Sequence, residues 1–440
     1  LFRSVLLAGF GIAVASWAFG WFDNGRRPAD VLPAQVSAYL ELDLAPAPWQ
    51  QLQAWSFLHD VPEVRAAGGR PEPKLLLWQL IGSRLGYADD VDFAVDVQPW
   101  LGDRAGFAIM AAPDEPTWMT AIELTDTDLG VATLKRWIGT RDQDYDVTAV
   151  DGYALITRGR HTDLVLAALE KGRLAREAAF SDELAAAGTP GFAALWADLG
   201  RLREPDPGNE SLRGRVAATL TFSGDAATWN GHASGLVLPT IEAPGRLGEL
   251  PASILAGFSV SGGAKAMPAL WPSLDSFARA WPRWTQVTEG DVAMLLGSSF
   301  SVAVPKGGDL FDRDYDLRVT TEDPGRAEAA LATIIADTEY RSLKHQVKGD
   351  VLVASRDAAA LNELAGTGPR LADLPEFKRA VPDHTRAIAS AYVDLRAAGW
   401  PSVEPDSAYA PFSDSIRALG GQYLPTGEGT GNWSIRLTSD

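Results

Sequence analysis

The sequence predicts an α+β protein in which an N-terminal transmembrane helix is followed by two duplicated α+β domains with mostly antiparallel sheets. Three observations predict this fold class: an apolar run at residues 4–22, stretches of alternating apolar and polar residues with short connections, and motifs that return in the second half. With 440 residues, of which 46% are hydrophobic, the chain can bury two ordinary cores. The predicted organisation is an anchor at 1–22, a tether at 23–33, a first repeat at 34–237, a linker at 238–250 and a second repeat at 251–440.

The apolar run from Ser4 to Phe22 contains no charged residue. At about 1.5 Å of rise per residue, a helix of this length spans roughly 28 Å, which is close to the hydrocarbon thickness of a bilayer. Small residues permit a neighbouring helix to approach closely, and aromatic rings favour the headgroup level. A signal peptide is the alternative, but the cleavage-like Ala13-Val14-Ala15 lies inside the run, which is longer than a usual signal sequence core. The residues assigned to anchoring and helix packing are Gly9, Gly11, Ala13, Ala15, Trp17 and Trp21.

The first repeat begins with a strand at 36–44, whose alternation places Val36, Ala38, Leu40, Leu42 and Leu44 on one face. Helices are predicted at 49–59 and 75–85, and the second is apolar on nearly every side, which is typical of a buried helix or of a surface made for a partner. A further helix at 127–138 has Thr127 or Asp128 as its expected N-cap. The other predicted strands are 107–111, 118–124, 153–157, 192–199, 216–222 and 228–237, and the other predicted helices are 161–174 and 181–187.

The motifs of the first repeat return in the same order in the second repeat. Leu101-Gly102 matches Leu296-Gly297, and Thr125, Asp128, Gly130 and Ala132 match Thr320, Asp323, Gly325 and Ala327 at an offset of about 195 residues. Each match is weak, but their preserved order indicates a duplication, and a period of this length makes each copy a complete domain. The first copy also carries extra residues around 66–87, including the apolar helix.

Four stretches carry a family resemblance. They are VSAYLELDL at 36–44, DVQPWLGDRAGFAIM at 96–110, SAYVDLRAAG at 390–399 and NWSIRLTSD at 432–440. Together with the N-terminal apolar run, they resemble a bacterial, notably actinobacterial, family of membrane-anchored envelope proteins catalogued as a domain of unknown function. The resemblance spans nearly the whole chain. It implies a single-pass anchor in the cell membrane and a body on the extracytoplasmic (periplasmic) side, and it brings no catalytic residues.

Composition excludes several function classes. The formal net charge of −18 argues against nucleic acid as a partner, because the phosphate backbone is itself negative. Cysteine is absent, so disulfides, thiolate metal sites and cysteine nucleophiles are excluded.

No pattern of catalytic or metal-binding residues is found. The five histidines show no metal-ligand spacing, and Asp142, Asp144 and Asp146 lack the glycine and the last carboxylate of a calcium loop. The near match to a hydrolase elbow at 257–261 has serine in place of the last glycine. The sequence therefore predicts a protein that is not an enzyme, with no catalytic residue, metal site or cofactor.

Tryptophan is abundant, with 15 residues. Those at 271–284 fall on one side of a predicted helix, which is typical of a core but also suits a cavity wall or a docking surface. The residues assigned to a partner or apolar-ligand surface are Leu75, Trp78, Ile81, Trp271, Trp281 and Trp284.

Two functional hypotheses follow. In the first, the chain is a non-enzymatic, single-pass membrane-anchored extracytoplasmic protein that serves as an accessory or assembly subunit of a larger membrane protein complex, so its partners are the membrane and an integral membrane protein. In the alternative, it is an envelope carrier that binds lipid or another apolar ligand between its two lobes.

Overall fold

The computed structural model divides into two compact units, which are described separately. Unit 1 comprises Leu1–Glu204 and Gly214–His232, and unit 2 comprises Pro205–Arg213 and Ala233–Asp440. The structure describes residues 26–59, 73–85, 91–113, 115–140, 144–202, 213–236, 241, 243–268, 271, 288–307, 315–336, 343–398 and 416–439.

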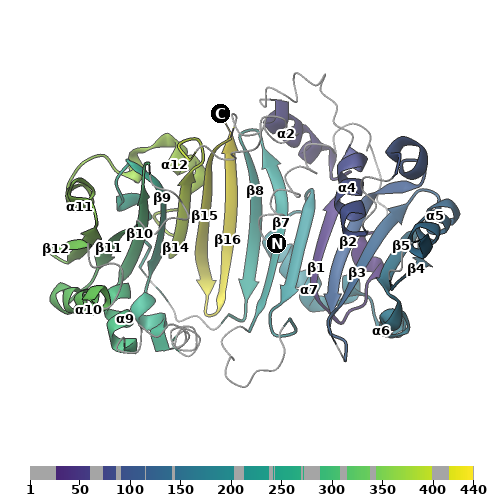
Figure 1. The fold of residues 1–440 in the computed structure, drawn as a ribbon, viewed down its shortest axis with the longest axis horizontal. Coiled ribbons are helices and arrows are strands. Elements are labelled where there is room, and N and C mark those ends of the chain that lie inside the picture. The colour runs from purple at the N-terminus through teal and green to yellow at the C-terminus, as the bar shows by residue number, and fades with distance from the viewer. Residues whose placement is uncertain are drawn as a thin grey trace. The chain divides into compact units, whose positions relative to one another are not determined.

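The described part of unit 1 contains eight strands. Their arrangement is shown in Figure 1. They are β1 (Val36–Asp43), β2 (Leu101–Met110), β3 (Thr117–Leu124), β4 (Tyr145–Val150), β5 (Tyr153–Arg158), β6 (Ala193–Asp198), β7 (Arg215–Ser223) and β8 (Ala226–Ser234). The helices are α2 (Pro48–His59), α4 (Pro73–Leu85), α5 (Thr127–Thr140), α6 (Thr162–Lys171) and α7 (Ala178–Ala187), with the short η2 (Pro28–Val31), η3 (Phe93–Val97), η4 (Gly159–His161) and η5 (Leu174–Arg176).

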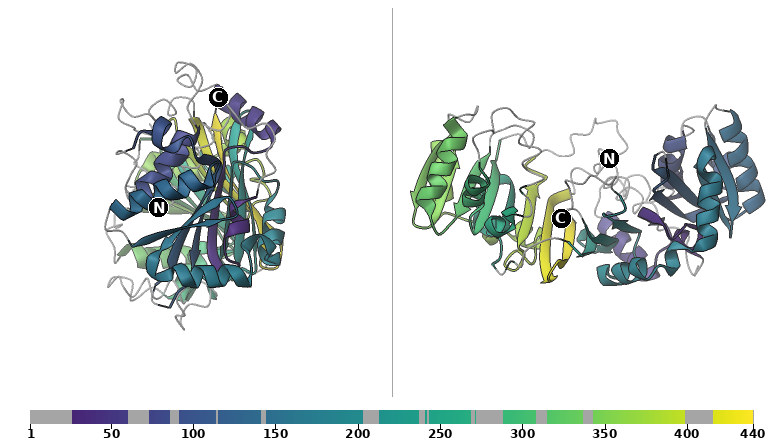
Figure 2. Two further views of the ribbon diagram at one scale, coloured as in Figure 1. Left: turned by 90° about the vertical axis from the view of Figure 1, so that its right-hand side faces the viewer. Right: turned by 90° about the horizontal axis from the view of Figure 1, so that it is seen from below.

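Helices cover both faces of the unit 1 sheet, so residues on both faces of its strands are buried (Figure 2). One face packs against α6, α7, η2 and η5, and this core includes Tyr39, Phe180 and Trp196. The other face packs against α2, α4 and α5. As a result β1 buries Glu41 and Tyr39 on one face as completely as Leu42 on the other. Both faces of β1 therefore contribute buried side chains.

Eight strands are also found among the residues of unit 2 that the structure describes. They are β9 (Ile254–Ser261), β10 (Ser299–Pro305), β11 (Asp316–Thr320), β12 (Lys344–Lys348), β13 (Val351–Ser355), β14 (Ala389–Asp394), β15 (Ile416–Gly427) and β16 (Thr430–Ser439). The helices are α9 (Glu289–Leu296), α10 (Pro324–Ala336), α11 (Ala358–Ala365) and α12 (Pro375–Ala380), with the short η6 (Leu247–Glu249) and η8 (Leu371–Asp373).

The strands of the two units follow the same order. It is β4-β5-β3-β2-β1-β6-β7-β8 in unit 1 and β12-β13-β11-β10-β9-β14-β15-β16 in unit 2. Smaller features also recur: an isolated bridge joins Pro33 to Arg173 in unit 1, and another joins Pro251 to Arg370 in unit 2. These correspondences allow equivalent positions of the two units to be compared.

The predicted fold class of two duplicated α+β domains with sheets of their own is wrong. The sixteen described strands belong to one antiparallel sheet. Alternation along a strand shows which residues face the core, whereas the order of strands is set by backbone hydrogen bonds, which leave no side-chain signature.

The predicted N-terminal transmembrane helix has no counterpart in the described structure. Residues 1–25, with the anchor positions Gly9, Gly11, Ala13, Ala15, Trp17 and Trp21, lie outside the described residues. Within the described ranges, every helix is too short or too polar to cross a bilayer.

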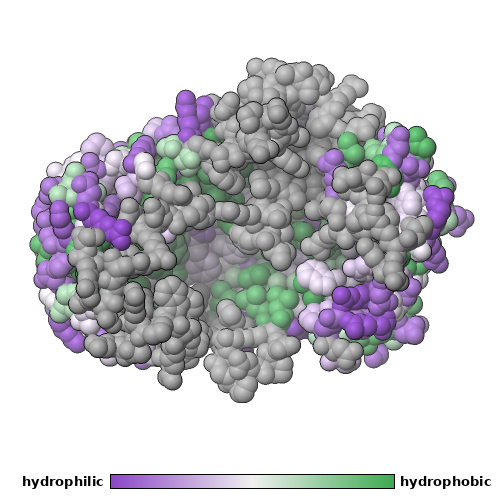
Figure 3. All heavy atoms as spheres, in the orientation of Figure 1, coloured by the Kyte–Doolittle hydropathy of each residue, from purple (hydrophilic) through white to green (hydrophobic). Residues whose placement is uncertain are grey.

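The segment that follows, predicted as a tether, is packed onto unit 1 from residue 26 onward. Ala29, Val31 and Leu32 are buried in the main core of the unit. A Cβ atom at Gly106 on β2 would lie only 2.4 Å from the Cβ of Pro28, so the close contact depends on glycine at this position. The start of the described chain is thus part of the folded body. Elsewhere, hydrophilic residues occupy much of the coloured surface in the view of Figure 3, in keeping with the net charge.

Candidate functional site

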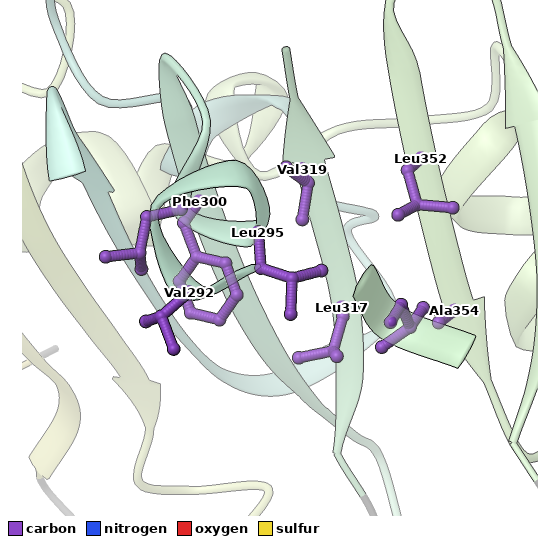
Figure 4. A pocket seen from close by; sticks show the side chains of 9 residues that line it. Val292, Leu295, Phe300, Leu317, Val319, Leu352 and Ala354 are labelled. Atoms are coloured by element: carbon purple, nitrogen blue, oxygen red, sulfur yellow. The ribbon is translucent and has the colours of Figure 1, made fainter. Parts of the chain in front are cut away.

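An apolar cavity of about 200 Å³ lies in unit 2 between the sheet and the helices α9 and α10 (Figure 4). We call it the unit 2 cavity. Its described lining is entirely apolar, so these residues offer no hydrogen-bonding side chain to a ligand. The lining residues are Val292, Leu295 and Leu296 of α9, Phe300 of β10, Leu317 and Val319 of β11, Leu331 of α10, and Leu352 and Ala354 of β13.

The floor of the unit 2 cavity is one face of the sheet. Phe300 is paired with Val319, which in turn is paired with Leu352, and Leu317 is paired with Ala354. Since directly paired residues of neighbouring strands point to the same face, their side chains form a continuous apolar surface.

The α9 helix covers this floor loosely. It begins with a capping box, in which the Asp291 backbone N–H donates to the Thr288 Oγ1 at 3.2 Å and the Thr288 N–H donates to the Asp291 carboxylate at 3.0 Å. It ends at Gly297, whose φ of 50° lies in the left-handed region that favours glycine. None of the α9 residues is fully buried, although Val292 and Leu295 point toward the sheet (Figure 4).

The equivalent place in unit 1 is filled by three tryptophans, which we call the tryptophan cluster. Trp78 of α4 contacts Trp100, with ring centroids 6.1 Å apart, and Trp137 of α5, with centroids 5.4 Å apart. Trp100 and Trp137 are themselves 6.1 Å apart. Trp100 precedes Leu101-Gly102 as Leu295 precedes Leu296-Gly297, so a large ring in unit 1 takes the place of a leucine that lines the cavity in unit 2.

The unit 2 cavity is only partly enclosed, so it is not equivalent to a sealed void in a core. Its shape and its apolar lining are complementary to an apolar group.

A second feature is an ionic cluster in unit 1. The Arg27 guanidinium donates to both carboxylate oxygens of Glu41, at 3.0 and 2.6 Å, and the Tyr39 hydroxyl donates to Glu41 at 2.9 Å. Burial by itself lowers the pKa of Arg27. The attraction of the neighbouring Glu41 carboxylate and the hydrogen bonds to it together have a larger effect, so the pKa of Arg27 is raised. Glu41 is 1% exposed, and the Arg27 guanidinium and the Tyr39 hydroxyl supply hydrogen bonds to its buried carboxylate.

The cluster continues across the sheet to β2 and β3. The Arg104 Nε lies 3.2 Å from the Asp43 carboxylate, and its Nη1 lies 3.5 Å from Glu123. Burial raises the pKa of Asp43, although Arg104 acts in the opposite direction. Acids and bases are paired throughout this cluster, so we interpret it as a structural clamp.

The corresponding positions of unit 2 carry hydroxyl groups. Ser259 Oγ and Ser301 Oγ lie 2.9 Å apart, and Ser261 donates to the Ala243 carbonyl at 2.5 Å. These serines and Ser299 are all buried. Paired charges therefore occupy these positions in unit 1, where the described N-terminal segment packs, and hydroxyl groups occupy them in unit 2.

A third feature is the reversed polarity of α2. Gln50 and Gln51 are 0% and 3% exposed, whereas Trp49 and Leu52 are 50% and 62% exposed. The Gln50 side chain accepts a hydrogen bond from the Phe222 N–H at 3.0 Å, and the Gln51 amide donates to the Pro46 carbonyl at 2.7 Å. The buried face of the helix combines these two glutamines with Ala54 and Phe57, whereas Trp49 and Leu52, one turn apart, face solvent.

The sequence-predicted surface residues lie in different environments. Trp78 and Ile81 are each 1% exposed, so they are core residues, and Leu75 is half-buried. Trp271 is half-buried, and Trp281 and Trp284 lie outside the described residues. The four of these residues that the structure describes, Leu75, Trp78, Ile81 and Trp271, do not line the unit 2 cavity.

Sequence reasoning missed both the cavity and the exposed face of α2. The cavity-lining residues alternate as in any strand core, so nothing in the sequence distinguishes them. The pattern Trp-Gln-Gln-Leu at 49–52 was the available signal for α2.

Comparisons with protein-family models, with curated proteins and with solved structures give no match. Among the described residues, no group of three or more histidine, aspartate or glutamate side chains is arranged to hold a metal ion.

Proposed function

We propose that this chain is a non-enzymatic accessory or assembly subunit of a membrane protein complex, attached to the membrane through its apolar residues 4–22, with its body on the extracytoplasmic side. The observation that carries the proposal is α2, which exposes Trp49 and Leu52 while burying two glutamines. Tryptophan is enriched in the energetically dominant centres of protein interfaces.

The place of α2 in unit 1 supports this proposal. The helix follows the end of β1, and its Gln50 is bonded to Phe222 at the end of β7. The same end of the sheet holds the start of the described chain, because the Tyr153 hydroxyl at the start of β5 donates to the Arg26 carbonyl at 2.5 Å.

Chain length limits how far this end can lie from the membrane. Arg26 follows Phe22 by four positions, and an extended chain spans at most about 3.6 Å per position, or roughly 14 Å in total. The end of unit 1 that carries α2 is therefore close to the membrane surface whenever residues 4–22 are inserted.

Charge favours a protein partner over the lipid headgroups themselves. Asp92, Asp126 and Asp128 are exposed at this same end, next to η3 and α5. Carboxylates disfavour contact with an anionic leaflet. The partner proposed for Trp49 and Leu52 is an integral membrane protein with an apolar patch above the bilayer.

Gentle detergent extraction of the natively expressed protein tests this function. We expect the wild-type chain to co-migrate with a stoichiometric integral membrane protein, and Trp49→Ser/Leu52→Gln to lower its recovery at least tenfold. Because both side chains are exposed, the free energy of unfolding should change by no more than about 0.5 kcal/mol. Leu164→Gln on α6, an exposed leucine away from α2, is the matched control and should retain the partner.

Undiminished recovery with the double variant would contradict the proposal. A different outcome is that the wild type recovers no protein partner and the double variant binds protein-free liposomes less well than the wild type. That outcome would show that α2 contacts the bilayer instead.

A further inference from the structure

We propose that the unit 2 cavity is a binding site for an aliphatic hydrocarbon chain. This inference goes beyond the subunit function and does not depend on it, because the cavity lies inside unit 2 and α2 belongs to unit 1.

The chemistry of the lining selects the class of ligand. Leucine, valine, phenylalanine and alanine side chains form the described wall. A polar or charged group placed there would lose its hydrogen bonds to water without replacement, which disfavours sugars, nucleotides and ions. Only an apolar group gains free energy by entering.

The volume sets the size of the ligand. An engineered apolar cavity of about 150 Å³ stays dry and binds benzene. The unit 2 cavity, at about 200 Å³, is larger and therefore accommodates a hydrocarbon of roughly six to eight carbon atoms on the same scale.

Comparison with unit 1 shows that the fold does not require this space. At the equivalent place unit 1 packs the tryptophan cluster of Trp78, Trp100 and Trp137. The helix that closes the site also differs: Trp78 of α4 is 1% exposed, whereas α9 has no fully buried residue. In unit 1 tryptophan side chains fill the site, and α4 packs tightly over it. In unit 2 the site is open and α9 packs loosely over it, so a ligand can enter.

Two sources can supply such a chain: the acyl chain of a membrane lipid or a small free hydrocarbon. Both use the same chemistry, and one experiment separates them. The full chain is placed in lipid nanodiscs with ¹³C-labelled methyl groups on valine and leucine. Nanodiscs containing phosphatidylcholine with a nitroxide near the acyl-chain end form one arm, and titration of n-hexane into unlabelled nanodiscs forms the other.

We expect the methyl signals of Val292, Leu317 and Leu352 to respond. Selective broadening by the nitroxide lipid identifies a lipid chain as the occupant, and saturable shifts with n-hexane alone identify a free hydrocarbon. Either result supports the proposal. No broadening together with no saturable shift at these methyl groups would overturn it.

Variants that fill the cavity provide the control for specificity. Leu295→Trp introduces the ring that unit 1 carries at Trp100 and should weaken n-hexane binding at least tenfold. Val292→Phe is a smaller change from the same half-buried helix and serves if the first variant does not fold. Leu164→Trp places the same ring on an exposed position of α6 and should leave binding unchanged. Equal binding by the filled variants and the control would also overturn the proposal.

Discussion

At the scale of single residues, unit 1 and unit 2 use different side chains to fill equivalent sheet positions. Unit 1 has paired charges at Glu41, Asp43 and Arg104, where unit 2 has buried serines. The clamp in unit 1 also involves Arg27, which lies only five residues after the apolar run. We interpret the ionic cluster as the means by which the N-terminal segment is fixed to the body.

The buried tyrosines beside this cluster predict a loss of stability at high pH. Burial, followed by the nearby Glu41, raises the pKa of Tyr39 well above 10, and burial with Glu123 raises that of Tyr153. Above pH 10 the unfolded chain ionises these groups while the folded chain keeps them neutral. Their contribution to stability is therefore complete below about pH 10 and declines as the pH rises further.

Urea unfolding between pH 9.5 and 11 measures this effect. We expect Tyr153→Phe to reduce the decline in the free energy of unfolding by an amount that grows with pH and approaches its limit of about 1.4 kcal/mol per pH unit, the value for one proton, near pH 11. An unchanged slope in the variant, or normal ionisation of both tyrosines in the folded protein, would contradict the explanation.

Sequence reasoning could not predict this cluster. The carboxylates Glu41 and Asp43 alternate with Leu40 and Leu42, which indicates a strand with a polar face in water. Glu41 is instead buried, because Arg27 reaches it from a segment that was predicted to be a tether. A charge becomes a core residue only through a partner distant in sequence, and no local pattern records that partner.

At the scale of single elements, caps and helix faces decide what is exposed. The N-cap of α5 is Asp126, which accepts a hydrogen bond from the Leu129 N–H at 3.0 Å, and not Thr127 or Asp128 as the sequence suggested. Asp323 caps α10 in the same way through the Arg326 N–H. The structural equivalent of Asp323 is therefore Asp126, two residues before the Asp128 chosen from the sequence match.

A prediction at this scale concerns the buried hydrogen bond between Gln50 of α2 and the Phe222 N–H. Gln50→Ala removes the acceptor of the Phe222 N–H and leaves that buried group unpaired, which costs about 1–3 kcal/mol. Denaturant unfolding should show this loss, while Gln53→Ala, at an exposed position of the same helix, should stay within about 0.5 kcal/mol of the wild type. Equal effects of the two substitutions would show that the buried hydrogen bond does not hold α2 in place.

At the scale of the whole molecule, the sequence predicted many strands and helices close to their observed positions, including α5 and β3. It did not predict that the strands belong to one sixteen-stranded sheet. It also did not predict the unit 2 cavity, because a cavity depends on the side-chain volumes of five elements together. Trp271, the residue of the tryptophan-rich segment at 271–284 that the structure describes, does not line the cavity.

The proposed function requires that α2 contact an integral membrane protein. The most direct measurement is photocrosslinking in native membranes from a benzophenone amino acid placed at position 52, with position 164 on α6 as the control. We predict one dominant adduct with an integral membrane protein from position 52, and none from position 164. Adducts with lipid alone, or equal yields from both positions, would contradict the assignment of α2 as the docking helix of a membrane-complex subunit.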